Sequence, residues 1–143
     1  MYVTWAVLCE TAITDAESNN ISLITLIDHV ALPIQPPKES KMGILGSRLA
    51  VITLWRREDP SLPEQGEGRI RFLSPDGTEL LEKSFPINLS KFIRMRTRLQ
   101  LPGLPFGGVE GHYNFVFDYK SGDAGWDHRF ELPLQIDILG EGE

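Results

Sequence analysis

The chain has 143 residues, of which 41% are hydrophobic and 24% are charged, which fits one folded domain and excludes a disordered chain. No apolar stretch approaches the roughly 20 residues that a membrane-spanning helix needs. The formal net charge of −6 disfavours general binding to nucleic acid. Residues 48–100 nevertheless contain ten Lys and Arg against seven Asp and Glu, so a local basic surface is compatible with the acidic whole.

The beginning of the chain already has the pattern of a strand, with no basic segment and no cleavage site of an export signal. Cys9 is the only cysteine, so the chain cannot form an internal disulfide. We therefore expect a cytoplasmic protein without a membrane anchor.

Eight short runs rich in β-branched and aromatic residues are separated by Gly, Pro, Asn and Asp. This spacing is typical of an all-β sandwich or barrel. We predict one domain over residues 1–143, a two-layer antiparallel β-sandwich of about eight strands, immunoglobulin-like or fibronectin-like. The runs are 2–13, 21–32, 48–57, 68–74, 78–89, 92–101, 112–119 and 126–139.

The early runs are apolar on both faces, whereas the last three alternate apolar and polar residues. A strand that is apolar on both faces needs cover on both. We expect this cover to come either from the chain's own long loops or from another subunit. The apolar side that carries Trp5 and Trp55 is therefore a candidate surface for binding a partner.

Two connections are long for a compact domain, residues 33–47 and 58–67. The first contains the apolar residues Met42, Ile44 and Leu45, which are further candidates for partner binding. The second is rich in proline and acidic residues and is expected to be a loop.

Arg94, Arg96 and Arg98 alternate with apolar residues, so a strand would place three guanidinium groups in a row, about 6.5 to 7 Å apart. Arg69 and Arg71 show the same alternation on another predicted strand. If the two strands pair, the five arginines form a basic face suited to carboxylates or phosphates. The alternative is a solvated face whose arginines pair with acids on neighbouring strands.

Several segments together carry a resemblance to a known family: Cys9-Glu10 closing the first run, Ile21-Ser-Leu-Ile-Thr-Leu-Ile-Asp28, the exit Leu32-Pro33, and Leu101-Pro-Gly-Leu-Pro-Phe106 before Gly111-His-Tyr-Asn-Phe115. With them the chain resembles a family of small bacterial Ig-like β-sandwich proteins of unknown function. The resemblance implies the fold and a cytoplasmic bacterial setting, and no catalytic residue. Gly111-x-Tyr113-x-Phe115 also resembles a tyrosine corner, in which Tyr113 would bond to upstream backbone.

Reactive side chains are few and scattered. Cys9 is in period with apolar residues, which favours a buried thiol over a nucleophile. The three histidines, His29, His112 and His128, do not have the spacing of joint metal ligands.

Asp118, Asp123 and Asp127 surround a glycine-containing hairpin. Their oxygens could bind calcium, but the spacing matches no EF-hand and Lys120 intrudes, so turn chemistry is the better interpretation.

The sequence thus predicts no catalytic site, metal site or cofactor, and favours a non-enzymatic protein-binding module. Its partner would be an acidic protein or a second copy, held by the Trp5/Trp55 side or the 33–47 loop and steered by the arginines. The first alternative is a sandwich that binds sugar or calcium at the 118–127 hairpin. The second is a binder of anions or nucleic acid.

Overall fold

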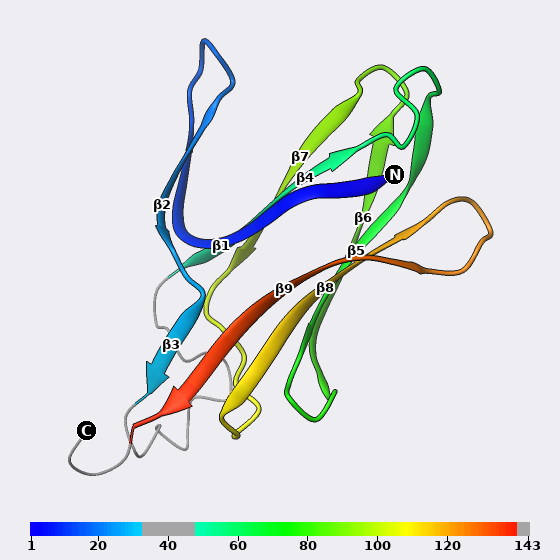
Figure 1. Cartoon of the computed structure of the whole chain (residues 1–143). Coiled ribbons are helices and arrows are strands. Elements are labelled where there is room, and N and C mark those ends of the chain that lie inside the picture. Colours follow the sequence, from blue (N-terminus) through cyan, green and yellow to red (C-terminus); the bar gives the residue numbers. More distant parts are fainter. Residues whose placement is uncertain (33–47, 140–143) are drawn as a thin grey trace.

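The computed structural model describes residues 1–32 and 48–139, and over these ranges it contains nine β-strands and no helix. Figure 1 shows that the strands form two layers. One sheet has the order β2-β1-β4-β7 and the other β3-β9-β8-β5-β6, which confirms the predicted β-sandwich. The strands are β1 (Tyr2–Thr14), β2 (Ile21–Leu26), β3 (His29–Leu32), β4 (Leu49–Arg56), β5 (Glu64–Leu73), β6 (Glu79–Leu89), β7 (Arg94–Leu101), β8 (Gly111–Lys120) and β9 (Asp127–Ile138).

The main core lies between the two sheets and is built from alternate residues of their strands. Phe72 on β5 packs against Tyr113 and Phe115 on β8, with ring centroids 5.5 and 4.5 Å apart. From the other sheet, Trp55 is completely buried and meets Phe85 of β6 edge to face at 6.0 Å. Each sheet thus contributes one apolar face to the core.

The run 21–32, predicted as one strand, is divided between the two sheets. β2 pairs with β1 in the four-stranded sheet, and β3 pairs with β9 in the five-stranded sheet. The backbone of Thr25 has a φ of 56°, unusual for a β-branched residue, just before the chain crosses over. Because β3 and β9 run parallel, the prediction of a purely antiparallel sandwich is wrong at this pair.

The predicted loop 58–67 is shorter than expected, because β5 already begins at Glu64. Its prolines and acidic residues gave the segment the composition of a loop. A Cβ on Gly66 would lie 2.4 Å from the Lys120 carbonyl oxygen, and one on Gly68 would lie 2.6 Å from Ile87 Cδ1. Glycine is needed here because neighbouring strands approach closely. The other long connection contains Met42, Ile44 and Leu45, which lie outside the described residues.

Tyr113 bonds to upstream backbone as the sequence predicted. Its hydroxyl donates a hydrogen bond to the Val109 carbonyl at 2.6 Å and accepts one from the Gly107 N–H at 3.3 Å. The tyrosine thereby fixes the connection between β7 and β8 to the core.

The predicted turn Ser74-Pro-Asp-Gly77 joins β5 to β6. Gly77 has a φ of 86°, and its N–H bonds to the Ser74 carbonyl at 2.9 Å. The Asp76 carboxylate accepts hydrogen bonds from the Ser74 hydroxyl and from the Thr78 N–H. These bonds to the ionised form lower the pKa of Asp76 from 3.8 to about 2.

The contribution of this turn to stability should depend on pH. A lowered pKa in the folded state means that Asp76 contributes stability above its ordinary pKa and loses that contribution as the pH falls toward about 2. We expect Asp76→Asn to be less stable than the wild type near neutral pH, with the difference shrinking through this window. Urea unfolding at a series of pH values measures it, and a difference independent of pH would contradict the turn's role.

Candidate functional site

The outward face of the four-stranded sheet carries a second, smaller apolar cluster. Cys9, Ala50 and Ile52 are 2% exposed or less, although they belong to the face that points away from the main core. Ile21 and Leu23 of β2 pack against them. Over residues 1–32 and 48–139, the cover that the early runs require therefore comes from the β1–β2 hairpin of the chain itself.

The hairpin leans across β4 as far as β7. β1 pairs with β4 up to Cys9 and with β2 beyond it, and Figure 1 shows β1 bending where its partner changes. Arg98 Nη2 donates to the Ala12 carbonyl at 2.7 Å, and Arg96 Nη2 donates to the Asn19 carbonyl at 2.9 Å. Two arginines of the predicted stripe thus hold the hairpin over the sheet.

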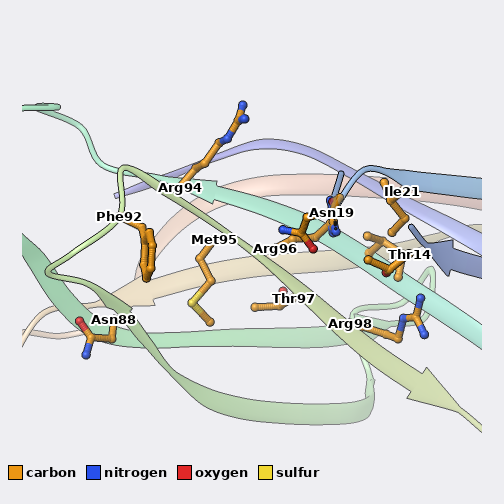
Figure 2. Close-up of a pocket in the computed structure, with 11 residues that line it drawn as sticks. Thr14, Asn19, Ile21, Asn88, Phe92, Arg94, Met95, Arg96, Thr97 and Arg98 are labelled. Atoms are coloured by element: carbon orange, nitrogen blue, oxygen red, sulfur yellow. Dashed lines mark hydrogen bonds between the residues drawn. The ribbon is translucent and has the colours of Figure 1, made fainter. Parts of the chain in front are cut away.

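Between the hairpin turn and β7 lie two adjoining hollows of about 560 and 1050 Å³. Figure 2 shows the smaller one, with Arg96 beside Asn19 of the turn and with Arg94 and Met95 leaving β7 on opposite sides. Trp5 and Phe92 supply aromatic surface to the larger hollow. We call the two hollows together the basic groove, because five cations line them: Arg56, Lys91, Arg94, Arg96 and Arg98.

The positive charge of the basic groove is not balanced within the described chain. None of the residues lining the two hollows is Asp or Glu, and over residues 1–32 and 48–139 none of the five cations forms an ion pair with a carboxylate. Asp15, in the hairpin turn, accepts the backbone N–H groups of Glu17 and Ser18 instead. Those bonds lower the pKa of Asp15.

Two of these cations stand directly opposite each other. The register of β4 and β7 pairs Arg56 with Arg94, and Arg57 N–H donates to the Ile93 carbonyl one step further on. In an antiparallel ladder the position next to a hydrogen-bonded pair is a non-hydrogen-bonded pair, where the side chains are closest. Like charges at such a position destabilise a sheet, so an anion bound between them would relieve the repulsion.

No family model and no curated protein matches the chain.

Trp5 and Trp55, predicted to share one apolar surface, lie on opposite faces of the sheet. A β-bulge between Val3 and Trp5 shifts the register of β1 against β4. Trp5 consequently points outward and lines the groove, half-buried, whereas Trp55 is completely buried in the main core. Trp55 therefore offers no exposed surface to a partner. The two tryptophans do not share a face because of the bulge in β1, which cannot be read from alternation alone.

Arg69 and Arg71 do not extend the arginine stripe of β7, since β5 belongs to the other sheet. Both bind Asp118 on β8. Arg69 donates through Nε and Nη2 to Asp118 Oδ2 at 3.0 and 2.8 Å, and Arg71 Nε donates to the same oxygen at 2.9 Å. For this pair of arginines the alternative interpretation holds in part: they pair with an acid on a neighbouring strand, but that acid is the buried Asp118 and the cluster is not a solvated face.

The 118–127 hairpin is occupied by its own contacts. Asp118 is 2% exposed and shares its charge with two arginines, which leaves it unsuited to calcium. Trp126 is covered by the Arg69 guanidinium and the Lys120 amine, 4.3 and 4.9 Å from its ring centroid. In residues 1–32 and 48–139 no group of three or more metal-ligating side chains converges.

Cys9 and His29 have structural partners. Cys9 is buried, its thiol lies 3.7 Å from the Ala50 carbonyl, and burial raises its pKa although Arg98 acts against this. His29 contacts Asp137 at 2.7 Å. The hydrogen bond from the Gln135 amide, and after it the one from His29, lowers the pKa of Asp137. Within the described residues there is no helix that could cross a membrane.

Sequence reasoning missed three residues of the groove: Arg56, Lys91 and Asn19. Arg56 follows Leu54 at a spacing of two, which puts it on the outward face of β4, but only the register with β7 reveals that it faces Arg94. Lys91 lies between β6 and β7 and Asn19 lies in a turn, where alternation says nothing about direction. A positive φ of 59° at Asn19 lets its carbonyl reach Arg96.

Proposed function

We propose that the chain is a non-enzymatic protein-binding module that holds an acidic segment of a partner protein in the basic groove. The observation that carries this proposal is the unbalanced pair of Arg56 and Arg94, directly opposite each other, with no carboxylate from residues 1–32 or 48–139 lining the groove. Repulsion at a non-hydrogen-bonded pair favours a bound anion. Planar guanidinium groups bind carboxylates in a bidentate manner.

The surroundings of the groove favour a polypeptide over a nucleic acid. Phe92 and Ile93, beside the cations, are 69% and 48% exposed, so apolar side chains of a partner can be buried next to its acids. The net charge of −6 repels a long polyanion. Trp5 and Phe92 are the two aromatic side chains that line the groove, whereas single-strand binders combine several stacking platforms.

The proposed location of the protein is the bacterial cytoplasm. An immunoglobulin-like sandwich from the family of small bacterial proteins, located in the cytoplasm, would bind another cytoplasmic protein. The free, buried Cys9 is compatible with a reducing compartment.

Arg94→Glu tests the proposal because it separates binding from folding. The substitution would place Glu opposite Arg56, which turns a repulsive pair into an attractive one and is expected to raise the free energy of unfolding by up to about 1 kcal/mol. It also reverses a charge of the groove. We expect it to weaken binding of a fluorescent peptide in which Glu alternates with Val by about tenfold or more, measured by fluorescence anisotropy.

Lys120→Glu is the matched control, because it changes the net charge equally and lies in the other sheet. It is expected to leave the affinity for the peptide within about twofold of the wild type. A high concentration of salt should weaken wild-type binding. The proposal fails if Arg94→Glu and Lys120→Glu bind the peptide equally, or if a DNA oligonucleotide binds more tightly than the peptide.

A further inference from the structure

β7 is the last strand of its sheet. It pairs with β4 on one side, and over residues 1–32 and 48–139 no strand pairs with its other side. An unpaired edge presents a row of free N–H and C=O groups that another extended segment can bind. The groups exposed at this edge can be identified from the register.

The free backbone groups of β7 belong to its three arginines and to Gln100. Arg57 N–H donates to the Ile93 carbonyl, and Arg57 and Ile93 continue the β4–β7 register by one step. In an antiparallel ladder the hydrogen-bonded positions recur at every second residue, so Met95 and Thr97 direct their backbone groups toward β4. The N–H and C=O groups of Arg94, Arg96 and Arg98 therefore point to the open edge.

The side chains of β7 present two different surfaces along this edge. The guanidinium groups lie on the outward face, while Met95 and Leu99 are partly buried against the main core on the inward face. The smaller hollow is lined from both faces, by the arginines and also by Met95, Thr97 and Asn88 of β6, as Figure 2 shows. It thus follows the edge of the strand.

We propose that the acidic partner segment adds to β7 as a fifth strand of the four-stranded sheet. This inference rests on the function proposed above and specifies how the segment binds. Main-chain hydrogen bonds to Arg94, Arg96 and Arg98 supply the pairing. Because successive side chains of a strand alternate between faces, the segment carries acids at every second position, opposite the guanidinium groups, and apolar residues between them, against Met95 and Leu99.

Charge selects a partner strand over a second copy of this chain. If two copies joined through β7, arginines of one copy would face arginines of the other, and like charges directly opposite destabilise a sheet. The nearby edge strand β6 is protected by Pro86, which cannot donate to an added strand. Neither β7 nor β2, the other edge of the same sheet, contains a proline or an acid, but only β7 of the two carries cations, so it is the edge suited to an acidic strand.

The test uses the Glu/Val peptide, made to the length of β7 and methylated at one backbone nitrogen at a time. Methylation removes a donor, so it should disrupt binding only where the peptide N–H faces β7. We expect alternate positions to lose about tenfold or more in affinity and the intervening positions to lose about twofold or less. A peptide with the same composition but with its Glu residues in one block should bind more weakly.

Amide hydrogen exchange of the protein gives the second readout. In the free protein the N–H groups of Arg94, Arg96 and Arg98 should exchange fast, and they should be protected when the Glu/Val peptide is bound. Those of Met95 and Thr97, bonded to β4, should change little.

The outcomes separate this inference from the proposed function. Binding that Arg94→Glu abolishes, but that shows neither an alternating effect of methylation nor protection of the arginine amides, overturns strand addition and leaves the acidic-partner function intact. Peptide binding that is indifferent to Arg94→Glu overturns both. Concentration-dependent protection of the same amides without peptide, together with dimerisation, would show that a second copy is the occupant.

Discussion

Asp118→Ala is expected to lower the free energy of unfolding by about 3 kcal/mol, because removing one partner of a buried ion pair leaves the other charges uncompensated. Asp118 is 2% exposed and accepts three hydrogen bonds from two arginines. The side chains of Arg69 and Arg71 are only 17% and 28% exposed, so water cannot fully replace the lost carboxylate. Denaturation by urea measures the change.

Asp127→Ala is the control for this prediction. Asp127 is a carboxylate near the same hairpin, but it is 71% exposed and lies 3.6 Å from Arg129. Exposed pairs contribute little, so the loss should be about 0.5 kcal/mol or less. Replacing Asp118, Arg69 and Arg71 together by apolar residues should recover part of the stability. Equal losses for Asp118→Ala and Asp127→Ala would show that the cluster is solvated.

Ile52→Ala is expected to cost about 3 kcal/mol, the amount typical of a large aliphatic side chain removed from a closed core. Ile52 faces outward from β4, yet it is 0% exposed because the β1–β2 hairpin covers it. On a sheet face open to water the same substitution would cost little.

Leu54→Ala provides the comparison on the same face of β4. Leu54 lies two residues further along the strand, beside the groove, and is only half-buried, so its loss should cost about 1 kcal/mol. Chemical denaturation of the two variants compares the two sites. If Ile52→Ala costs no more than Leu54→Ala, then the hairpin does not cover the sheet in solution, and the groove beside it loses one wall.

Much of the fold was predictable from alternation and turn composition. Tyr113, Phe115 and Phe117 alternate with more polar residues and are buried as expected, and Ser74-Pro-Asp-Gly77 forms the turn that its residues predict. Alternation failed where geometry is set by distant segments. Gly66 looked like part of a proline-rich, acidic loop, but it lies in β5, where the Lys120 carbonyl and the Tyr119 side chain of β8 leave no room for a Cβ.

The site was predictable only in part. The arginines of β7 were recognised because a period of two is visible in one segment of sequence. The strand that pairs with β7 could not be predicted in the same way, because the topology of the whole chain decides which strands are neighbours. Arg56 therefore became part of the site only with the β4–β7 register, and the bulge after Val3 separated Trp5 from Trp55.

An NMR titration of the protein with the Glu/Val peptide tests directly whether the basic groove is the binding surface. We expect the amide signals of Trp5, Asn19, Phe92 and Arg94–Leu101 to shift as peptide is added, while those near Trp126 in the other sheet stay unchanged. Shifts centred on the Trp126 hairpin, or the same shifts in Arg94→Glu as in the wild type, would contradict this expectation.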